Sequence, residues 1–331
     1  MRAFDKMTTQ QLAPSYRCSN SCLAKRYYYL PWEIGGMKMG FRFAAAAFAV
    51  IASISVLPAH NAALAQERLR FAVTDVEGLE GLQREYGPFK SAFEKASGMK
   101  LDLFPVSGRT AAVEAMAADQ IDLVLTGPAE YVVFHARLKA QPVVSWGRPD
   151  YYSQVVVLEN GPIRSSGDLK GKKVSFGEIG STSQHLGPAQ LLRDAGLVHG
   201  SDYEPVYLKL NVAIEAMIRG DLAAVGMNRT HLERVVKAYP DRQFKILYKS
   251  APLPNDLIIA SPKLKAETVK KIRAAFVDNA DSIMKAVIST SENAKFVGGA
   301  FGAELNDRDY DPVRMMFRAV NVNEFTKFIG N

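Results

Sequence analysis

Three hydroxyl residues, Ser181, Thr182 and Ser183, stand in a row just after Gly180 and just before a run with helical spacing. They follow a short strand-like stretch over residues 173–176. The first N–H groups of a helix have no partner inside it, and the helix dipole places partial positive charge there. Hydroxyl donors beside those groups favour a small oxyanion as ligand. The alternative is a plain helix cap, because Ser and Thr are common at that position.

The same stretch also permits a catalytic interpretation, in which Ser181 or Ser183 is a nucleophile and His185 is its base. A base so few positions along one turn is poorly placed to reach the hydroxyl, so His185 would instead help to bind the anion, cap the helix or lie on the surface. The chain also lacks a GxxxxGK[ST] loop, a GxSxG elbow and an HExxH motif. We therefore expect a binding protein, not an enzyme, with no cofactor and no metal.

The charge balance argues against a nucleic-acid partner. The whole chain carries 41 Lys/Arg and 34 Asp/Glu. Residues 1–65 hold seven and two of these, which leaves 34 and 32 in residues 66–331, a net charge of +2. A nearly neutral chain of this kind has little electrostatic attraction for nucleic acid.

The N-terminal region has the pattern of a secretory signal over residues 37–65. Lys38 and Arg42 precede an apolar run, and Ala63-Leu64-Ala65 is a small-x-small cleavage site. The alternative is an uncleaved membrane anchor. We expect cleavage near Ala65 and a periplasmic location. We interpret residues 1–36 as a doubtful extension upstream of the true start, the alternative being a disordered cytoplasmic tail. Both cysteines of the chain lie in that extension.

Strand-like and helix-like segments alternate along residues 66–331 and restart after Pro142. This order predicts parallel strands with helices on their faces. We expect an α/β protein of two lobes, each a mostly parallel sheet flanked by helices, with a ligand cleft at the hinge. Lobe 1 would comprise residues 66–146 and 249–331, and lobe 2 residues 147–248. The chain would cross between them near 143–152 and 246–252, which makes a hinge.

The individual elements follow from periodicity and from Gly and Pro breaks. The predicted strands cover residues 69–73, 101–106, 121–125, 154–158, 173–176, 204–210, 222–225, 244–248 and 257–260. The predicted helices cover residues 86–96, 110–118, 129–138, 184–195, 212–219 and 228–239.

Five short segments have the content and order of one protein family. They are GMKLDL from Gly98, AADQIDLVLTGPAEY ending at Tyr131, GSTS from Gly180 with Pro188 after it, AIEAMIRG ending at Gly220, and SAPLPND ending at Asp256. Together they resemble the phosphate-, phosphite- and phosphonate-binding proteins of ABC importers, the PhnD-like class of type II periplasmic binding proteins. The resemblance covers nearly all of residues 68–300.

The resemblance implies that Tyr131, the turn Ser181–Ser183 and Asp256 line the ligand pocket. Glu130, next to Tyr131, would pair with a ligand amine or would be a solvated residue of a first helical turn. Tyr131 could instead pack beneath the helix that begins at residue 129.

Three positions depart from the family pattern. Asn211 stands where the family usually has His, Ala223 where it has Asp, and Gln184 where it has Gly. Asn211 remains a candidate pocket donor or a helix cap. Arg109 and Arg229 are candidates for the charge lost with the histidine, or are surface arginines. Tyr86 is a candidate pocket wall.

The function implied by the resemblance is capture of a small phosphorus oxyanion, namely a phosphonate, phosphite or phosphate, by hinge closure. The protein, expected to be a monomer, would deliver it to the transmembrane subunits of an ABC permease. Asp256 would accept a hydrogen bond from a protonated oxyanion, so sulfate should bind poorly. Alternatives are the same fold with another organic anion, an enzyme that processes phosphoesters or phosphonates, and a sensory domain.

Overall fold

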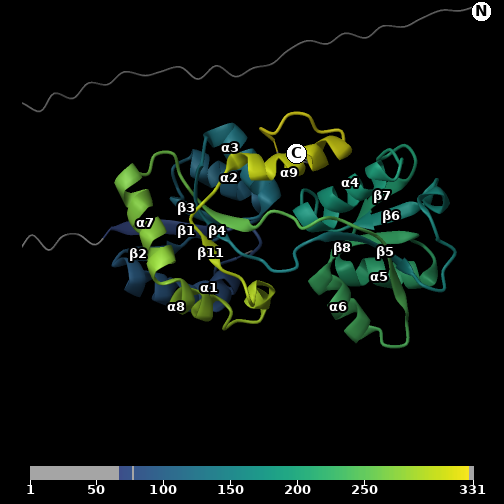
Figure 1. The fold of residues 1–331 in the computed structure, drawn as a ribbon, viewed down its shortest axis with the longest axis horizontal. Coiled ribbons are helices and arrows are strands. Elements are labelled where there is room, and N and C mark those ends of the chain that lie inside the picture. Colours follow the sequence, from purple (N-terminus) through teal and green to yellow (C-terminus); the bar gives the residue numbers. More distant parts are fainter. Residues whose placement is uncertain (1–66, 77, 328–331) are drawn as a thin grey trace, which may run out of the picture. The chain divides into compact units, whose positions relative to one another are not determined.

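The computed structural model of the protein describes residues 67–76 and 78–327. The predicted extension over residues 1–36, the predicted signal peptide over residues 37–65 and the expected cleavage near Ala65 lie outside the described residues. Within the described part, no helix is both long enough and apolar enough to cross a membrane. Two sheets organise the described chain into two α/β units, which we call lobe 1 and lobe 2 (Figure 1).

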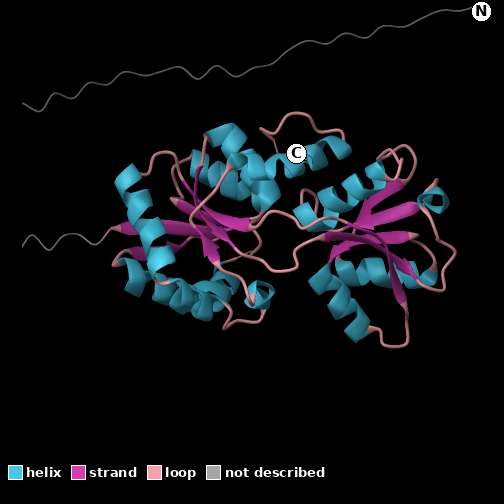
Figure 2. Ribbon diagram, in the orientation of Figure 1, coloured by secondary structure: helices cyan, strands magenta, loops and turns pink. Residues whose placement is uncertain are grey.

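Lobe 1 takes its strands from both ends of the described chain. Its elements are β1 (Arg68–Val73), α1 (Leu79–Ser97), β2 (Lys100–Leu103), α2 (Arg109–Ala117), β3 (Leu123–Thr126), α3 (Pro128–Leu138), β4 (Gln141–Trp146), β10 (Asp256–Ala260), α7 (Ala266–Asp278), α8 (Ala280–Val287), β11 (Phe301–Gly302) and α9 (Asp311–Ala319). The strands lie in the order β11-β4-β10-β3-β1-β2. Helices α1, α7 and α8 bury their apolar sides in one cluster, and α2, α3 and α9 in another, so the sheet is covered on both faces (Figure 2).

Lobe 2 is formed by the middle of the chain. Its elements are β5 (Ser153–Leu158), β6 (Lys173–Phe176), α4 (Gly187–Asp194), β7 (Glu204–Tyr207), α5 (Leu210–Arg219), β8 (Ala224–Asn228), α6 (Arg229–Ala238) and β9 (Phe244–Lys249). The strand order is β7-β6-β8-β5-β9. Helix α4 packs into the cluster that α3 and α9 share, while α5 and α6 enclose a separate cluster with β8. Short helical turns occur at Ser166–Leu169, Thr182–Leu186, Glu292–Phe296 and Asp307–Tyr310.

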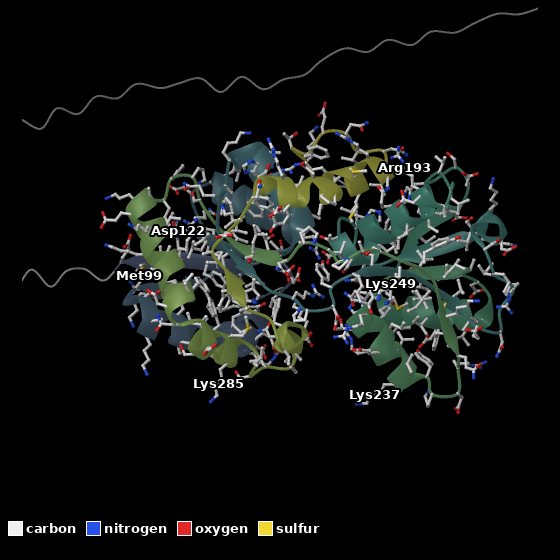
Figure 3. The ribbon with its side chains drawn as sticks, viewed as in Figure 1. Met99, Asp122, Arg193, Lys237, Lys249 and Lys285 are labelled. Atoms are coloured by element: carbon white, nitrogen blue, oxygen red, sulfur yellow. The ribbon has the colours of Figure 1, made fainter. Side chains whose placement is uncertain are left out.

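Helix α9 joins the two lobes on the side of α3 and α4. Phe317 of α9 belongs to one buried apolar cluster that contains Val132 of α3 and Leu192 of α4. A guanidinium N–H of Arg193 donates to the carbonyl of Arg318 at 2.6 Å, and Figure 3 shows Arg193 beside the end of α9. The lobes therefore share part of their core, in addition to the two chain segments that connect them.

Both sheets are mixed, whereas the sequence predicted mostly parallel ones. In lobe 1, β1 is parallel to β2 and β3, but β10 is antiparallel to β3 and β4. In lobe 2, β6 is parallel to β7 and β8, but β5 is antiparallel to β8 and β9. The antiparallel strands β4, β5, β9 and β10 flank the segments that connect the lobes. The chain leaves lobe 1 through β4, enters lobe 2 through β5, leaves it through β9 and returns to lobe 1 through β10. The predicted α/β fold with two sheets flanked by helices is confirmed.

Strand β4 occupies residues that the sequence analysis assigned partly to the first crossover. Pro142 was interpreted as a break, but it lies within β4 opposite a register shift between Ile258 and Ile259 of β10. Proline is tolerated at such a bulge, because the regular hydrogen-bond ladder is interrupted there. The connecting segment thus begins only after Trp146, and the second one lies between Lys249 and Asp256.

Candidate functional site

A cleft of about 790 Å³ lies between the lobes and is lined by both. The connecting segment after β4 contributes Arg148, Pro149 and Tyr151. The remaining lining is strongly polar: lobe 1 provides Asp75, Arg109, Gly127, Glu130, Asp256, Ser291, Glu292, Ala294, Lys295 and Val297, and lobe 2 provides Glu178, Ser181, Thr182, Ser183, Gln184, Asn228, Arg229, Thr230, His231, Glu233, Arg234 and Lys237. Polar residues from both sides favour a small polar or charged ligand over an apolar one.

The hydroxyl turn forms the lobe 2 wall of this cleft. Ser181, Thr182 and Ser183 are all buried, and Thr182–Leu186 is a π-helical turn that leads directly into α4. The N–H groups of His185 and Leu186 both donate to the carbonyl of Ser181, at 3.1 and 3.0 Å. Wide turns of this kind recur at functional sites. The N–H groups at its start have no acceptor within the helix and are available to a ligand.

Close contact with the sheet holds the turn in place. A Cβ atom on Gly187 would lie 1.9 Å from Oγ of Ser153 in β5, and one on Gly226 of β8 would lie 2.8 Å from Cβ of Pro188. Glycine at these two positions lets the turn and the start of α4 press against the strands. The sequence thus fixes the turn through residues that do not contact the cleft.

His185 lies behind the turn and not in the cleft lining, so of its predicted roles direct binding of an anion is the least supported. Its Nδ1 accepts a hydrogen bond from the N–H of Gly180 at 3.0 Å, and its Nε2 is 3.3 Å from the hydroxyl of Tyr207. Burial, with a smaller contribution from nearby His199, lowers the pKa of His185 to about 3. The ring is therefore neutral, with Nδ1 as acceptor and Nε2–H as donor, and it anchors the turn from below.

Two helix N-termini, one from each lobe, approach each other beside the cleft. The N–H of Ala129, at the second position of α3, donates to Oγ1 of Thr182 at 3.0 Å. The hydroxyl of Thr182 thus caps the helix of the opposite lobe, and the starts of both helices point to the same place. Such N-termini carry partial positive charge and favour an anion.

Ion pairs cross and line the cleft around this point. The guanidinium of Arg109 pairs with the buried carboxylate of Glu130, lies 3.4 Å from Asp75, and reaches across to Glu178 of lobe 2 at 2.9 Å. Asp75 is also paired with Lys295 at 3.2 Å. Burial acts to raise the pKa of Asp75, but Lys295 and Arg109 outweigh it and hold that pKa well below its usual range.

Asp256 differs from Asp75 in its balance of charges. It is 5% exposed, and its closest cation is Arg148 at 3.7 Å, too far for a hydrogen bond. Burial raises the pKa of Asp256 above its ordinary value, although Arg148 and Lys295 act in the opposite direction. This carboxylate is consequently a strong acceptor for an O–H group brought by a ligand.

Seven of the eleven predicted site residues line the cleft: Ser181, Thr182, Ser183, Asp256, Arg109, Glu130 and Arg229. Tyr86 lies next to it, in the wall of a small recess. Tyr131 faces away, because Glu130 takes the cleft side of α3. The hydroxyl of Tyr131 donates to Asp307 at 2.9 Å, and its ring contacts Tyr310 with centroids 4.5 Å apart.

Asn211 also lies outside the cleft lining. Strand β7 ends at Tyr207, three residues before the predicted end, and α5 begins at Leu210. Asn211 is therefore an exposed residue inside the first turn of α5 and does not cap that helix. The cap within reach of the cleft is Asn228, whose side chain accepts from the N–H of His231 and donates to Oγ of Ser183 at 3.2 Å.

The charged and aromatic lining residues that sequence reasoning missed include Asp75, Arg148, Tyr151 and Lys295. Arg148 and Tyr151 lie in the predicted crossover, and the guanidinium of Arg148 stands 4.0 Å from the ring centroid of Tyr151. Their position beside a predicted hinge is the sequence signal by which these two residues could have been identified. Asp75 follows the end of β1, where ligands of parallel sheets often bind, whereas nothing in the local sequence singles out Lys295. Among the described residues, no group of three or more His, Cys, Asp or Glu is arranged to hold a metal ion.

Comparison with known proteins identifies the class of this cleft. The family model of periplasmic substrate-binding proteins of phosphonate ABC transporters matches residues 71–298. The phosphonates-binding periplasmic protein of Escherichia coli K12 is 27% identical over an alignment of 248 residues, which covers 71% of this chain and 73% of that protein. The phosphate-import protein PhnD of Mycolicibacterium smegmatis is 26% identical over 276 residues, 75% and 84% of the two chains.

Solved structures agree on the fold. The binding-protein component of an ABC phosphonate transporter from Pseudomonas aeruginosa has a TM-score of 0.59 at 19% identity, covering 76% of this chain and 85% of its own. PhnD1 of Prochlorococcus marinus, solved with methylphosphonate, has a TM-score of 0.60 at 17% identity, covering 77% and 98%. With a family match over residues 71–298, this chain belongs to the family of periplasmic substrate-binding proteins of ABC phosphonate transporters.

Proposed function

We propose that the protein captures a small phosphorus oxyanion, a phosphonate, phosphite or phosphate, and delivers it to the transmembrane subunits of an ABC permease. The observation that carries this proposal is the meeting of two helix N-termini, one from each lobe, at the 3.0 Å contact between Ala129 and Thr182. The buried carboxylate of Asp256 lines the same cleft. An anion that carries its own proton satisfies both features.

The oxygens of such a ligand would be held by the lobe 2 turn. Oγ1 of Thr182 accepts from Ala129, so its own O–H remains available to donate. The hydroxyls of Ser181 and Ser183 and the first N–H groups of the turn would add further donors. Roles for Tyr131 and Asn211 are not part of this proposal, because both side chains lie outside the cleft lining.

Asp256 would select for the protonated form of the ligand. Phosphate, phosphite and methylphosphonate all carry an O–H group as monoanions, and a carboxylate with a raised pKa accepts or shares that proton. Sulfate has no such proton near neutral pH, so it would place two negative charges in contact. We therefore expect exclusion of sulfate.

The hydrogen bonds of His185 support a binding role over an enzymatic one. Its Nδ1 is occupied by Gly180, and its Nε2 faces Tyr207 behind the turn. It is thus not in position to take a proton from Ser181 or Ser183 on the cleft side. We infer that the protein acts without catalysis, as a monomer.

The remaining parts of the proposal concern location and movement. The exported protein would begin after cleavage near Ala65. Lobe 1, residues 66–146 and 249–331, and lobe 2, residues 147–248, would close on the ligand about the two connecting segments. The ion pair between Arg109 and Glu178 spans the lobes and would favour the closed arrangement.

The proposal is tested by ligand-induced stabilisation. Purified residues 66–331 are heated with phosphate, phosphite, methylphosphonate, 2-aminoethylphosphonate or sulfate, and Trp146, buried in the core of lobe 1, reports unfolding. A ligand at about 100 times its Kd adds roughly 2.7 kcal/mol, which raises Tm by a few degrees. A rise with at least one phosphorus oxyanion and none with sulfate is expected. No rise with any of them would overturn the proposal and favour a different organic anion.

A further inference from the structure

The cleft continues into a small recess within lobe 1. The recess has a volume of about 10 Å³ and shares Asp75, Gly127, Asp256 and Lys295 with the cleft. A volume of this size holds roughly one water molecule or one non-hydrogen substituent. It lies where the carboxyl ends of β1 and β3 meet, the end of a sheet at which ligands of α/β proteins bind.

Polar groups form part of the wall of the recess. Thr74 directly follows β1 and Thr126 is the last residue of β3, and their hydroxyls are 3.4 Å apart. Both side chains are at least 97% buried. The carboxylate of Asp75 and the ammonium of Lys295, paired at 3.2 Å, form another part of the wall. The apolar share comes from Val73, Leu125 and Phe296.

Tyr86 contributes a buried phenol to the wall of the recess. The residue is 1% exposed, and its ring packs against Phe71 and Phe89 with centroids 6.3 Å away in each case. Burial and the negative charges of Asp75 and Asp256 raise the pKa of its phenol, so the O–H keeps its proton. A guest in the recess that accepts a hydrogen bond from this phenol is favoured over one that cannot accept it.

We propose that this recess receives the fourth substituent of the bound phosphorus and selects a hydroxyl there, which makes inorganic phosphate the preferred ligand. The inference rests on the proposed function, because the other oxygens must be held by the Ser181–Ser183 turn and Asp256. A hydroxyl both donates and accepts, so it can pair with Tyr86 and with Asp75 or the threonines. A recess built from such groups rejects a substituent that can do neither.

Three ligands separate this inference from the broader one. The monoanions of phosphate, phosphite and methylphosphonate each bring one O–H group for Asp256. At the fourth position, phosphate has a second hydroxyl, methylphosphonate has a methyl group of similar size, and phosphite has only a hydrogen. Methylphosphonate therefore tests whether the recess requires a polar substituent, because its methyl group is nearly the size of a hydroxyl. Phosphite tests the effect of leaving the recess without a substituent.

The experiment is calorimetric titration of the protein with these three ligands at pH 7. We expect phosphate to bind at least about tenfold more tightly than methylphosphonate and phosphite. In Tyr86→Phe, which keeps the ring, phosphate affinity should fall about tenfold while the other two change by less than about twofold. Thr126→Val, which keeps the shape of the threonine, should act in the same direction if Tyr86→Phe does not fold.

Matched controls remove hydroxyls that lie elsewhere. Tyr310→Phe deletes a buried phenol that donates to the carbonyl of Asn255 at 3.3 Å, and Thr268→Val deletes a buried hydroxyl that donates to Glu67 at 2.6 Å. Neither should change the ratio of affinities. The recess proposal alone would be overturned if the unchanged protein bound phosphate and methylphosphonate equally. It would also be overturned if both recess variants kept the same ratio of phosphate to methylphosphonate affinity as the unchanged protein. Failure of all three ligands to bind would instead overturn the proposed function.

Discussion

Asp256 and Asp75 are two buried carboxylates in one cleft, and they have opposite shifts because their cation partners differ. Lys295 and Arg109 approach Asp75 to 3.2 and 3.4 Å, whereas Arg148 stays 3.7 Å from Asp256. The first carboxylate is therefore a fixed negative charge that orients its neighbours. The second retains a raised pKa and is the one that can share a ligand proton.

This difference leads to a prediction for Asp256→Asn. The amide can donate an N–H to a ligand oxygen, and it removes the repulsion that a carboxylate exerts on a fully ionised anion. Phosphate affinity at pH 7 should fall about tenfold, and sulfate should gain measurable binding. Calorimetric titration with both ions checks this, with the exposed Asp311→Asn as control. Continued exclusion of sulfate by the variant would contradict the assigned role.

His185 gives a prediction about acid stability. Its pKa in the folded protein, about 3, is below the unfolded value of 6.5. The neutral ring therefore stabilises the fold fully above pH 6.5, and this contribution is lost as pH falls from about 6.5 towards 3, by at most about 1.4 kcal/mol per pH unit. His185→Asn keeps an acceptor for Gly180 and has no such titration, so its stability should fall less steeply.

Urea unfolding at pH 7, 6, 5 and 4 measures the two slopes. His231, whose burial also lowers its pKa to about 3, adds a similar loss in both proteins, so the variant should reduce the slope without abolishing it. Identical slopes would show that His185 is already protonated in the fold. Because the ring stays neutral in the folded protein down to about pH 3, its support of the Ser181–Ser183 turn through Gly180 is unchanged over this range, and His185 should not make ligand affinity follow the loss of stability.

At the residue scale, sequence reasoning succeeded where local spacing carried the signal. Ser181–Ser183 follow a strand and precede a helix, and Asp256 ends a recognisable segment, so both could be placed in the cleft. Tyr131 lies outside the cleft lining because adjacent helical positions point about 100° apart, and Glu130 takes the cleft side. Lys295 could not be found, since only the tertiary fold brings it to Asp75, 220 positions away along the chain.

At the scale of elements, the close approach of α4 to the sheet determines where the hydroxyl turn lies. Gly187→Ala would place a Cβ atom 1.9 Å from Oγ of Ser153, so the π-helical turn must move. We expect a loss of about 1–3 kcal/mol in the free energy of unfolding, together with weaker phosphate binding. Gly87→Ala within α1 is the matched control, because an added Cβ meets nothing within 4 Å there and should be neutral or slightly stabilising. Equal effects of the two substitutions would mean that the turn tolerates displacement.

The bounds of helices and strands can be predicted where the hydrophobic periodicity is regular. The prediction is unreliable where a proline interrupts that periodicity. Residues 173–176 were predicted as a strand and form β6 with the same bounds. The sequence pattern does not predict β4, because Pro142 has the character of a break, and α1 begins seven residues before the predicted start although Pro88 lies inside it. Both prolines are accommodated by their surroundings, a β-bulge in one case and a long packed helix in the other, which a local pattern does not reveal.

At the scale of the whole described molecule, α9 is the element that ties the two lobes into one folding unit. Its buried residues share an apolar cluster with α3 of lobe 1 and α4 of lobe 2. A shared core couples the stabilities of the lobes, since neither can unfold without exposing part of the other. Thermal unfolding should therefore follow a single transition, with circular dichroism and Trp146 fluorescence giving the same midpoint.

Phe317→Ala tests this coupling directly, because Phe317 is 1% exposed and lies in the shared cluster. Removing the ring should cost about 3–5 kcal/mol. It should also separate the two midpoints, as Trp146 reports only lobe 1 while circular dichroism reports both lobes. Met315→Ala, on the same helix but 55% exposed, should change neither quantity beyond about 0.5 kcal/mol. Because α9 lies outside the cleft lining, ligand selectivity should persist in the folded variant. A large loss of stability with the midpoints still coincident would mean that the two connecting segments alone are enough to couple the lobes.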